Sequence, residues 1–416
     1  MIRTAAILQL LLGNIGIPGG GMNAERGHAN IQGNTDNAQS WELLPGYLAI
    51  PTPGMETIDA YVDQKAFAKL DPDSINYFGE HYRAFLVSLL KAWFGDAADA
   101  GNDFAYSWLP KPDKDWSWLT IHDEAFHGRL HGLFNGGMST VNIGPDSNRM
   151  IQTLSRLRWY VVMDPFPTAS SEFWHAPGVD PATVQTEVFF FPTTHWIEKS
   201  GSFTNSGRWV QWKHAALPLE GDIRNDVWIL AQLRKRLVEL YETEGGAFPD
   251  PILNLTWEYS DPDDPPLDEV AMEINGKDLA TGRQLATFDD ARENGTTSIG
   301  NWIYTGSFTD AGKHDGPPGD GGSHGARLLP RLDVVVAGQP PGSVQPRVRR
   351  SSRPALGSGT NGHRVERDDV GGGRAGLRRD LPAEGRARRV HHERRGRGSA
   401  VRAGPPAPRR SAAGTL

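Results

Sequence analysis

The chain has 416 residues and a formal net charge of −7, and it contains 13 Trp, 48 Gly and no Cys. This length can hold two or three domains with a sizeable core. The lack of Cys excludes disulfides, thiolate zinc sites and cysteine-held iron–sulfur clusters within the chain, and no apolar run reaches the ~18 residues of a transmembrane helix.

The charge is divided unevenly along the chain. Residues 313–416 hold 21 of the 43 Lys and Arg residues and 9 of the 50 acidic residues, a balance of +12, which leaves −19 for the rest. All 13 Trp lie at or before Trp302, and no Phe, Tyr or Trp follows Phe308. Two unlike polypeptides are therefore predicted to meet near residue 310.

Residues 4–12 are predicted to form an amphipathic helix that ends at Gly13. A secretory signal peptide is the alternative, because one Arg precedes an apolar run, although no small-residue cleavage motif follows.

Residues 13–46 form a glycine-rich segment around Arg26. Its first half holds six glycines from Gly13 to Gly27, which let the backbone turn with positive φ and approach a bulky ligand. A guanidinium suits the fork-shaped recognition of a small carboxylate or a phosphate. An ordinary surface loop is the alternative, and composition does not separate the two.

Apolar spacing predicts a helix over residues 82–94. Further along, helices predicted at 121–129, 148–157 and 226–244 alternate with short apolar strands at 132–134, 159–163 and 188–191. This order predicts an α/β fold with a parallel sheet covered by helices on both faces. Ligands of such sheets bind beyond the carboxyl ends of the strands, so residues 135–137, 164 and 193–208 are expected on one rim.

Two features have plainer alternatives. In GSFTNSGRW, residues 201–209, Asn205 and Arg208 fit a strand and turn near that rim, or an ordinary turn with a solvated Arg. His122, His127 and His131 could be mistaken for metal ligands. The glutamate spacing of a zinc protease helix is absent, so a solvated helix face is predicted instead.

Eight segments resemble the catalytic large subunit of respiratory formate dehydrogenases, in the molybdopterin oxidoreductase superfamily. They are QLLLGNIGIPGGGMNAERGHANIQG, LLPGYLAIP, SRLRWYVVMDPFPTASSEFW, QTEVFFFPTTHW, SGSFTNSGRWVQWK, LNLTWEY, EVAMEINGKDL and TTSIGNWIYTGS. They follow the order of that family over residues 4–310. The resemblance implies two-electron oxidation of formate to CO₂ at a molybdenum or tungsten centre held by two molybdopterin guanine dinucleotides. A nitrate reductase-like oxidoreductase of the same superfamily is the alternative.

The resemblance also implies roles for individual residues. Arg26 matches the arginine that orients formate, and His28 lies in the pocket for cofactor and substrate, so both are expected to be catalytic. No metal ligand is expected in this chain. The expected cofactor-binding residues match loops around the pterins and their guanine dinucleotides, and they are Gly27, Asn30, Gln32, Gly33, Asn135, Gly136, Gly137, Asp164, Thr194, Glu198, Gly201, Asn205 and Arg208.

The family places its 4Fe-4S cysteines and its metal-ligating selenocysteine or cysteine upstream of the matching residues. The chain is therefore expected to be an internal fragment that is inactive alone. Its expected parts are an active-site helix and glycine-rich loop (residues 1–50), an α/β region that binds molybdopterin guanine dinucleotide (residues 51–310) and a disordered tail (residues 311–416).

The family also implies partners and a location. The expected partners are formate, an iron–sulfur beta subunit and a membrane cytochrome gamma subunit. The family is periplasmic or membrane-associated, whereas this fragment, which lacks a signal peptide, is expected to be cytoplasmic if made alone.

The tail is predicted to be an out-of-frame translation. Residues 329–350 can be back-translated with synonymous codons that, read one base out of frame, encode YPAWTWSWPANRRVLYNRASA. This sequence resembles the tryptophan-rich segment that follows in the family. The alternative is an Arg/Gly-rich tail that binds nucleic acid. No nucleic-acid partner is expected, because the tail lacks the aromatic residues that would stack on bases.

Overall fold

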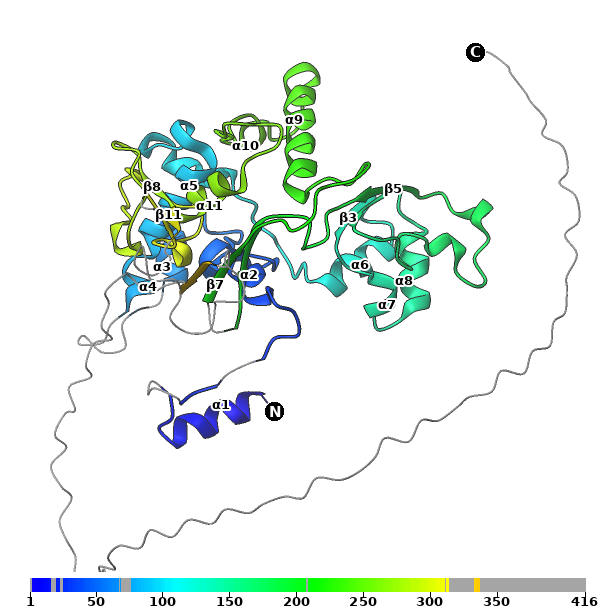
Figure 1. The fold of residues 1–416 in the computed structure, drawn as a ribbon, viewed down its shortest axis with the longest axis horizontal. Helices are drawn as coiled ribbons and strands as arrows, with labels where there is room; N and C mark the ends of the chain where they lie inside the picture. The colour runs from blue at the N-terminus through cyan, green and yellow to red at the C-terminus, as the bar shows by residue number, and fades with distance from the viewer. Residues whose placement is uncertain are drawn as a thin grey trace, which may run out of the picture. The chain divides into compact units, whose positions relative to one another are not determined.

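The computed structural model describes residues 2–15, 20–22, 25–66, 68, 76–206, 209–310, 312–313 and 333–336. Figure 1 draws these residues in colour, and all of them belong to the first of two units, Met1–Val348. The second unit, Arg349–Leu416, lies outside the described residues, as does most of the tail predicted to be disordered. None of the described helices is both long and apolar enough to cross a membrane.

The predicted N-terminal helix is present as α1 (Ile2–Leu11). Gly13 follows it with a φ of 66°, the left-handed conformation expected of a glycine after a helix. No residue of α1 is buried, and Ile2 and Leu11 are each 80% exposed. The apolar side chains of this helix are therefore not covered by other described residues.

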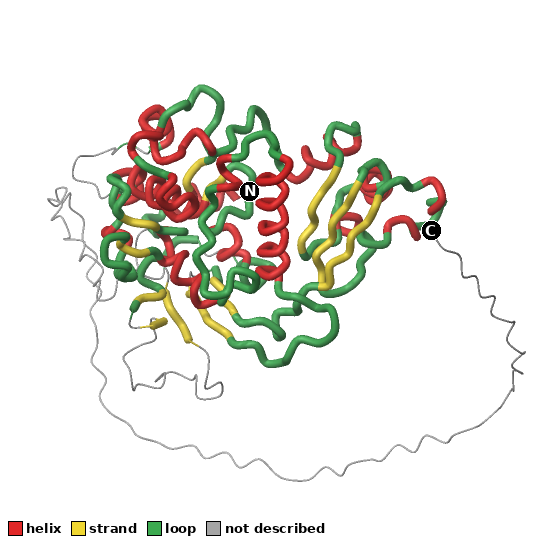
Figure 2. The backbone as a smooth tube through the Cα atoms, turned by 90° about the horizontal axis from the view of Figure 1, so that it is seen from above, coloured by secondary structure: helices red, strands yellow, loops and turns green. Residues whose placement is uncertain are grey.

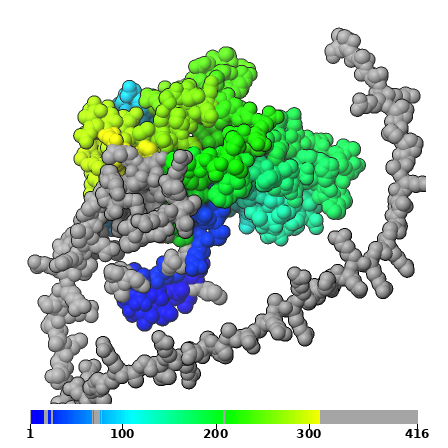
Figure 3. Space-filling model, viewed as in Figure 1, coloured from blue at the N-terminus to red at the C-terminus, as the bar shows by residue number. Residues whose placement is uncertain are grey.

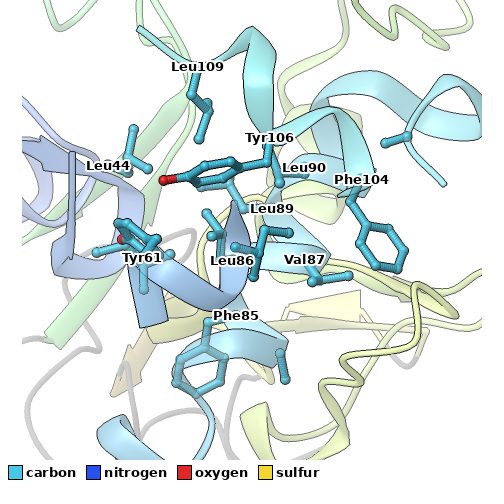
Figure 4. Packing of buried hydrophobic residues seen from close by; sticks show 14 of the residues in the cluster. Leu44, Tyr61, Phe85, Leu86, Val87, Leu89, Leu90, Phe104, Tyr106 and Leu109 are labelled. Carbon is cyan, nitrogen blue, oxygen red and sulfur yellow. The ribbon is translucent and has the colours of Figure 1, made fainter. Parts of the chain in front are cut away.

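The largest core surrounds α5 (Tyr82–Phe94), whose bounds match the prediction (Figure 4). Most of its side chains are buried, against α3 (Ile58–Lys65) and the segment that contains Tyr106. The helix ends at Gly95, whose φ is 50°. Thr256 satisfies the last carbonyls, because its backbone N–H donates to Trp93 O at 2.8 Å and its hydroxyl donates to Ala92 O at 2.5 Å.

The predicted parallel sheet is present and has the order β3 (Gly132–Gly136), β4 (Trp159–Asp164) and β5 (Glu187–Pro192), and Figure 2 shows its three strands side by side. In register, Phe134 faces Val161, and Val161 faces Phe189. One face packs on α6 (Trp118–Phe126) and α8 (Ser147–Leu154).

The prediction that helices cover both faces of this sheet is wrong for the described residues. Phe134, Phe189 and Phe191 lie on the second face, and they are 54%, 40% and 42% exposed. The apolar character of the strands was correctly seen, but alternate side chains on an apolar strand can point to a face that no described helix fills. The fold is therefore a mixed helix-and-sheet fold with a three-stranded parallel sheet.

A second, antiparallel sheet has the order β12 (Asp333–Val336), β7 (Trp209–Lys213) and β6 (Gly201–Thr204). The predicted long helix is present as α9 (Asp226–Glu244). The remaining elements are short: α2 (Ile31–Asp36), β1 (Leu43–Leu44), β2 (Leu48–Ala49), α4 (Tyr77–Glu80), α7 (Thr140–Ile143), α10 (Asp250–Leu253), α11 (Leu267–Asn275), β8 (Lys277–Asp278), β9 (Thr297–Ser298), β10 (Phe308–Thr309) and β11 (Gly312–Lys313).

The predicted solvated face of α6 is also corrected. His122 and Glu124 are buried, at 7% and 8% exposure, whereas His127 and His131, which follow the helix, are exposed. Glu124 forms ion pairs with Arg129 and Lys114, and hydrogen bonds from both side chains lower the pKa of its carboxyl to about 2. The helix therefore turns these polar side chains inward, where charge partners from neighbouring loops satisfy Glu124.

A partly buried carboxyl on α11, that of Glu273, predicts a pH effect. Burial raises the pKa of Glu273, which accepts a hydrogen bond from the Tyr259 hydroxyl. A carboxyl with a raised folded-state pKa gives most stability below its unfolded pKa of about 4.3 and loses it as the pH rises through the folded value. Glu273→Gln is therefore expected to raise the melting temperature at pH 8 and to change it little at pH 4. The exposed Glu244→Gln at the end of α9 is the control, and an equal shift in both variants would contradict this assignment.

Candidate functional site

The glycine-rich segment leads into α2, which packs against β6, so segments far apart in the sequence meet here (Figure 3). Asn30 makes the junction. Its side-chain oxygen accepts a hydrogen bond from the backbone N–H of Thr204 at 2.8 Å, and its amide nitrogen donates to Asn34 Oδ1 at 3.0 Å. The predicted residue Asn30 therefore joins the loop to the second sheet.

Gly33 permits this close approach. A Cβ atom at this position would lie 2.3 Å from Asn30 Oδ1 and 3.2 Å from the Cβ of Thr204. Any side chain would push α2 away from β6 or displace Asn30. Gly27, by contrast, is exposed and has open space around the Cβ position.

Arg26 is exposed and lies between these elements. Its backbone N–H donates to Ser206 Oγ at 3.4 Å, and its Nη2 donates to Gln32 Oε1 at 3.3 Å. Within the described part of the chain, no carboxylate forms an ion pair with this guanidinium. Its other N–H groups and its full charge can therefore bind a small anion.

A buried network beneath Arg26 was not predicted. Gln32 Nε2 donates to Asp36 Oδ1 at 2.7 Å and to the Tyr47 hydroxyl at 3.0 Å. The Tyr304 hydroxyl lies 3.0 Å from Asp36 Oδ2 and 2.9 Å from Thr204 Oγ1. Asp36 is fully buried. The only sequence signal was the four-residue spacing of Gln32 and Asp36, which places both on one helix face.

His28, the second predicted catalytic residue, is exposed. Its Nδ1 accepts a hydrogen bond from the backbone N–H of Asn30 at 3.1 Å. In the neutral ring this bond places the proton on Nε2, so His28 can offer an outward N–H donor.

The second group of predicted residues lies at the carboxyl ends of the parallel strands. Asn135 is buried, its amide nitrogen donates to Met138 O at 2.6 Å, and its side-chain oxygen accepts from Thr140 Oγ1 at 3.1 Å. Gly137 has a φ of 62°, and its N–H donates to Met163 O at 2.8 Å. Asn135 and Gly137 therefore shape the turn that begins at Gly136, and they leave its backbone at the rim.

Asp164 and Thr194 lie on the same rim. Asp164 Oδ1 accepts from the backbone N–H of Phe166 at 3.2 Å, and Oδ2 has no hydrogen-bond partner among the described residues. The hydroxyl of Thr194 is buried and also has no partner there. Below the rim, burial raises the pKa of Tyr160 on β4 to about 12, so its hydroxyl is neutral at physiological pH. The carboxylate of Asp164 and the hydroxyl of Thr194 thus have unused hydrogen-bonding capacity among the described residues.

The remaining predicted residues follow β5. Glu198 Oε2 accepts from the backbone N–H of His195 at 2.8 Å, Gly201 starts β6 and pairs with Lys213, and Asn205 follows the end of β6. Arg208 lies outside the described residues. The structure therefore gathers the predicted residues into a loop group around Arg26 and a rim group around Asp164, with Gly201 and Asn205 on the segment between them.

A small cavity of about 90 Å³ lies behind α2. It is lined by Gly33 and Asn37, by Thr204 and Trp212 of the second sheet, and by Ile274 of α11, together with other residues. Its walls are mostly apolar, so it does not resemble an anion site, and it was not predicted.

Comparison with known proteins shows which family the chain resembles. The family model described as "Molybdopterin oxidoreductase" matches residues 1–236. The chain is 41% identical to "Formate dehydrogenase, nitrate-inducible, major subunit" of Escherichia coli (strain K12) over 327 residues, which is 75% of this chain and 32% of that protein. It is 40% identical to "Formate dehydrogenase 2 subunit alpha (cytochrome c-553)" of Nitratidesulfovibrio vulgaris over 321 residues, 74% and 31% of the two chains. The chain thus spans about a third of the length of these relatives.

Proposed function

This chain belongs to the molybdopterin oxidoreductase family, and from that premise we propose that it forms part of the catalytic subunit of a formate dehydrogenase. The family implies a molybdopterin cofactor. Formate as the substrate comes from the relatives' names, since both relatives above and the Haemophilus influenzae protein, 40% identical, are formate dehydrogenases. The nitrate reductase-like alternative has no comparable support.

The observation that carries the proposal is the exposed guanidinium of Arg26, which has one neutral side-chain partner. Formate is a planar carboxylate, and a guanidinium can bind both its oxygens with parallel N–H donors. Held by both oxygens, formate keeps its C–H bond in one direction, which lowers the entropic part of the barrier. Oxidation to CO₂ removes two electrons and a proton from formate. A bound molybdopterin centre supplies the two-electron acceptor for this reaction.

His28 adds a second donor. Because its Nδ1 accepts from the Asn30 backbone, its Nε2–H can donate to an anion bound beside Arg26. In this protonation state His28 orients the anion and does not remove a proton from it.

The rim group fits a polar nucleotide-like ligand. The unpaired hydroxyl of Thr194 and the open oxygen of Asp164 have hydrogen-bonding capacity that a ribose or guanine edge would satisfy. We therefore propose that the parallel sheet is of the dinucleotide-binding type. Asp164, Thr194, Glu198 and the turn at Gly136 would then hold one or both guanine dinucleotides of a bis-pterin cofactor with molybdenum or tungsten.

The proposal extends to the family's other components. Because the chain has no Cys, thiolate ligands for a 4Fe-4S cluster must come from another polypeptide segment. An iron–sulfur beta subunit, a cytochrome gamma subunit and a periplasmic or membrane-associated location are proposed on the family resemblance. We propose that the chain has three parts: the active-site helix and loop in residues 1–50, the cofactor-binding region in residues 51–310, and out-of-frame sequence in residues 311–416. No observation on the described residues favours nucleic-acid binding.

The cofactor proposal can be tested by isolating the affinity-tagged chain with whatever accompanies it and hydrolysing the extract in acid. We expect GMP and pterin in equal amounts. In Asp164→Ala both are expected to fall together, whereas the exposed Asp222→Ala should retain them. Pterin without GMP, or equal retention in both variants, would refute the assignment of the rim.

A further inference from the structure

Among the described residues, Gln32 is the one side chain that holds the Arg26 guanidinium, and it is buried to 6% exposure. Its oxygen accepts from Arg26 Nη2 at 3.3 Å, and its nitrogen donates to Asp36 Oδ1 at 2.7 Å. The two ends of one amide therefore face opposite kinds of partner, a cation and a carboxylate.

Asp36 fixes which end faces which partner. Its carboxylate is fully buried, and Tyr304 donates to its second oxygen at 3.0 Å. A carboxylate can only accept hydrogen bonds, so Gln32 must turn its NH₂ toward Asp36 and its oxygen toward Arg26. The flipped amide would place oxygen against carboxylate and NH₂ against guanidinium, which loses both bonds.

The polarity of this arrangement matters for an anion site. A carboxylate at position 32 could hold Arg26 in the same place, but it would neutralise the guanidinium and compete with any bound anion. A neutral amide oxygen supplies the contact and leaves the positive charge available.

We propose that Gln32 is a positioning residue: Asp36 orients its amide so that a neutral oxygen holds Arg26 and leaves its charge for a small carboxylate. This inference rests on the proposed role of Arg26 in binding formate. It adds the contact that keeps the charge of Arg26 available to a bound anion. It assigns Gln32 to the control of substrate binding, a different role from the expected contact with the cofactor.

The test measures the reactivity of Arg26 itself. Phenylglyoxal attacks the neutral guanidine, so a carboxylate partner slows labelling, and the rate at each Arg can be followed by peptide mass spectrometry on the full 416-residue chain at pH 8. A glutamate at position 32 would lie against the Asp36 carboxylate, so Asp36→Asn is added to both glutamate variants, and Asp36→Asn alone is their reference. In Gln32→Glu we then expect labelling of Arg26 to slow by about tenfold, which corresponds to one unit of pKa. The exposed Gln39→Glu places the same charge nearby and should leave the rate within about twofold, because nearby solvent screens it.

If the far-ultraviolet circular dichroism spectrum shows that Gln32→Glu is not folded, a second variant keeps the test decisive. Gln32→Met removes the oxygen without adding charge. Labelling of Arg26 should then be at least as fast as in the wild type, and protection by formate should need about tenfold more formate, because the group is no longer held. Unchanged protection in Gln32→Met, or equal rates in the two glutamate variants, would overturn the role of Gln32.

Protection of Arg26 by formate tests the proposed function separately from this inference. If formate does not slow labelling of Arg26 in the wild-type chain, the assignment of Arg26 as the formate ligand fails. The comparison of Gln32→Glu with Gln39→Glu contains no formate, so it still decides whether Gln32 controls the charge of Arg26.

Discussion

Arg26→Lys is expected to lower kcat/KM for formate by about 10²–10³-fold in the enzyme that contains this chain, the loss typical of removing one aligned donor to a reacting anion. Lysine keeps the charge but replaces the planar fork by a single ammonium, so formate is bound without a fixed direction. Both a higher KM and a lower kcat are expected. Dye-linked formate oxidation with full Michaelis curves measures them.

The control for this variant is Arg236→Lys. Arg236 is exposed on α9 and pairs with Glu239, so the same chemical change there should leave kcat/KM unchanged. A loss below threefold in Arg26→Lys would show that formate is oriented by another group.

Gly46→Ala is expected to reduce the free energy of unfolding by about 3 kcal/mol, the sum of left-handed backbone strain and overpacking. Gly46 has a φ of 75°, and a Cβ there would lie 2.3 Å from Trp302 Cδ1. Trp302 cannot move easily, because it stacks on Phe85 at 4.5 Å and its Nε1 donates to Gly46 O at 2.7 Å. Urea unfolding followed by Trp fluorescence measures the change.

Gly54→Ala separates the two causes. Gly54 has a φ of 93° but nothing within 4 Å of its Cβ position, so only backbone strain of about 1 kcal/mol is expected. Equal losses in the two variants would show that contact with Trp302 contributes nothing.

The sequence predicted the long periodic elements well. The bounds of α5 and α9 match the predictions, and β3, β4 and β5 form the predicted parallel sheet. These elements carry a strong local signal: continuous apolar runs bounded by turns, or apolar residues at helical spacing. The position of Asp164 at the end of β4 followed from the same pattern.

The parts that were missed depend on contacts between distant segments. The six-residue helix α2 has too few residues for a periodic signal, and its place is set by the contact of Asn30 with Thr204, 174 residues away. The burial of Asp36 depends on Tyr304 in the same way. The open face of the parallel sheet could not be seen either, because an apolar strand reads alike whether or not helices cover it.

The most direct test of the proposed function is a substrate test on the affinity-tagged chain purified with its natural partners. We expect formate-dependent reduction of benzyl viologen, with ¹³C-formate converted to ¹³CO₂ in a one-to-one ratio with electron pairs, and no oxidation of reduced viologen by nitrate. Activity should follow the tagged chain through purification. Nitrate-dependent oxidation of the dye without formate activity would contradict the proposed function.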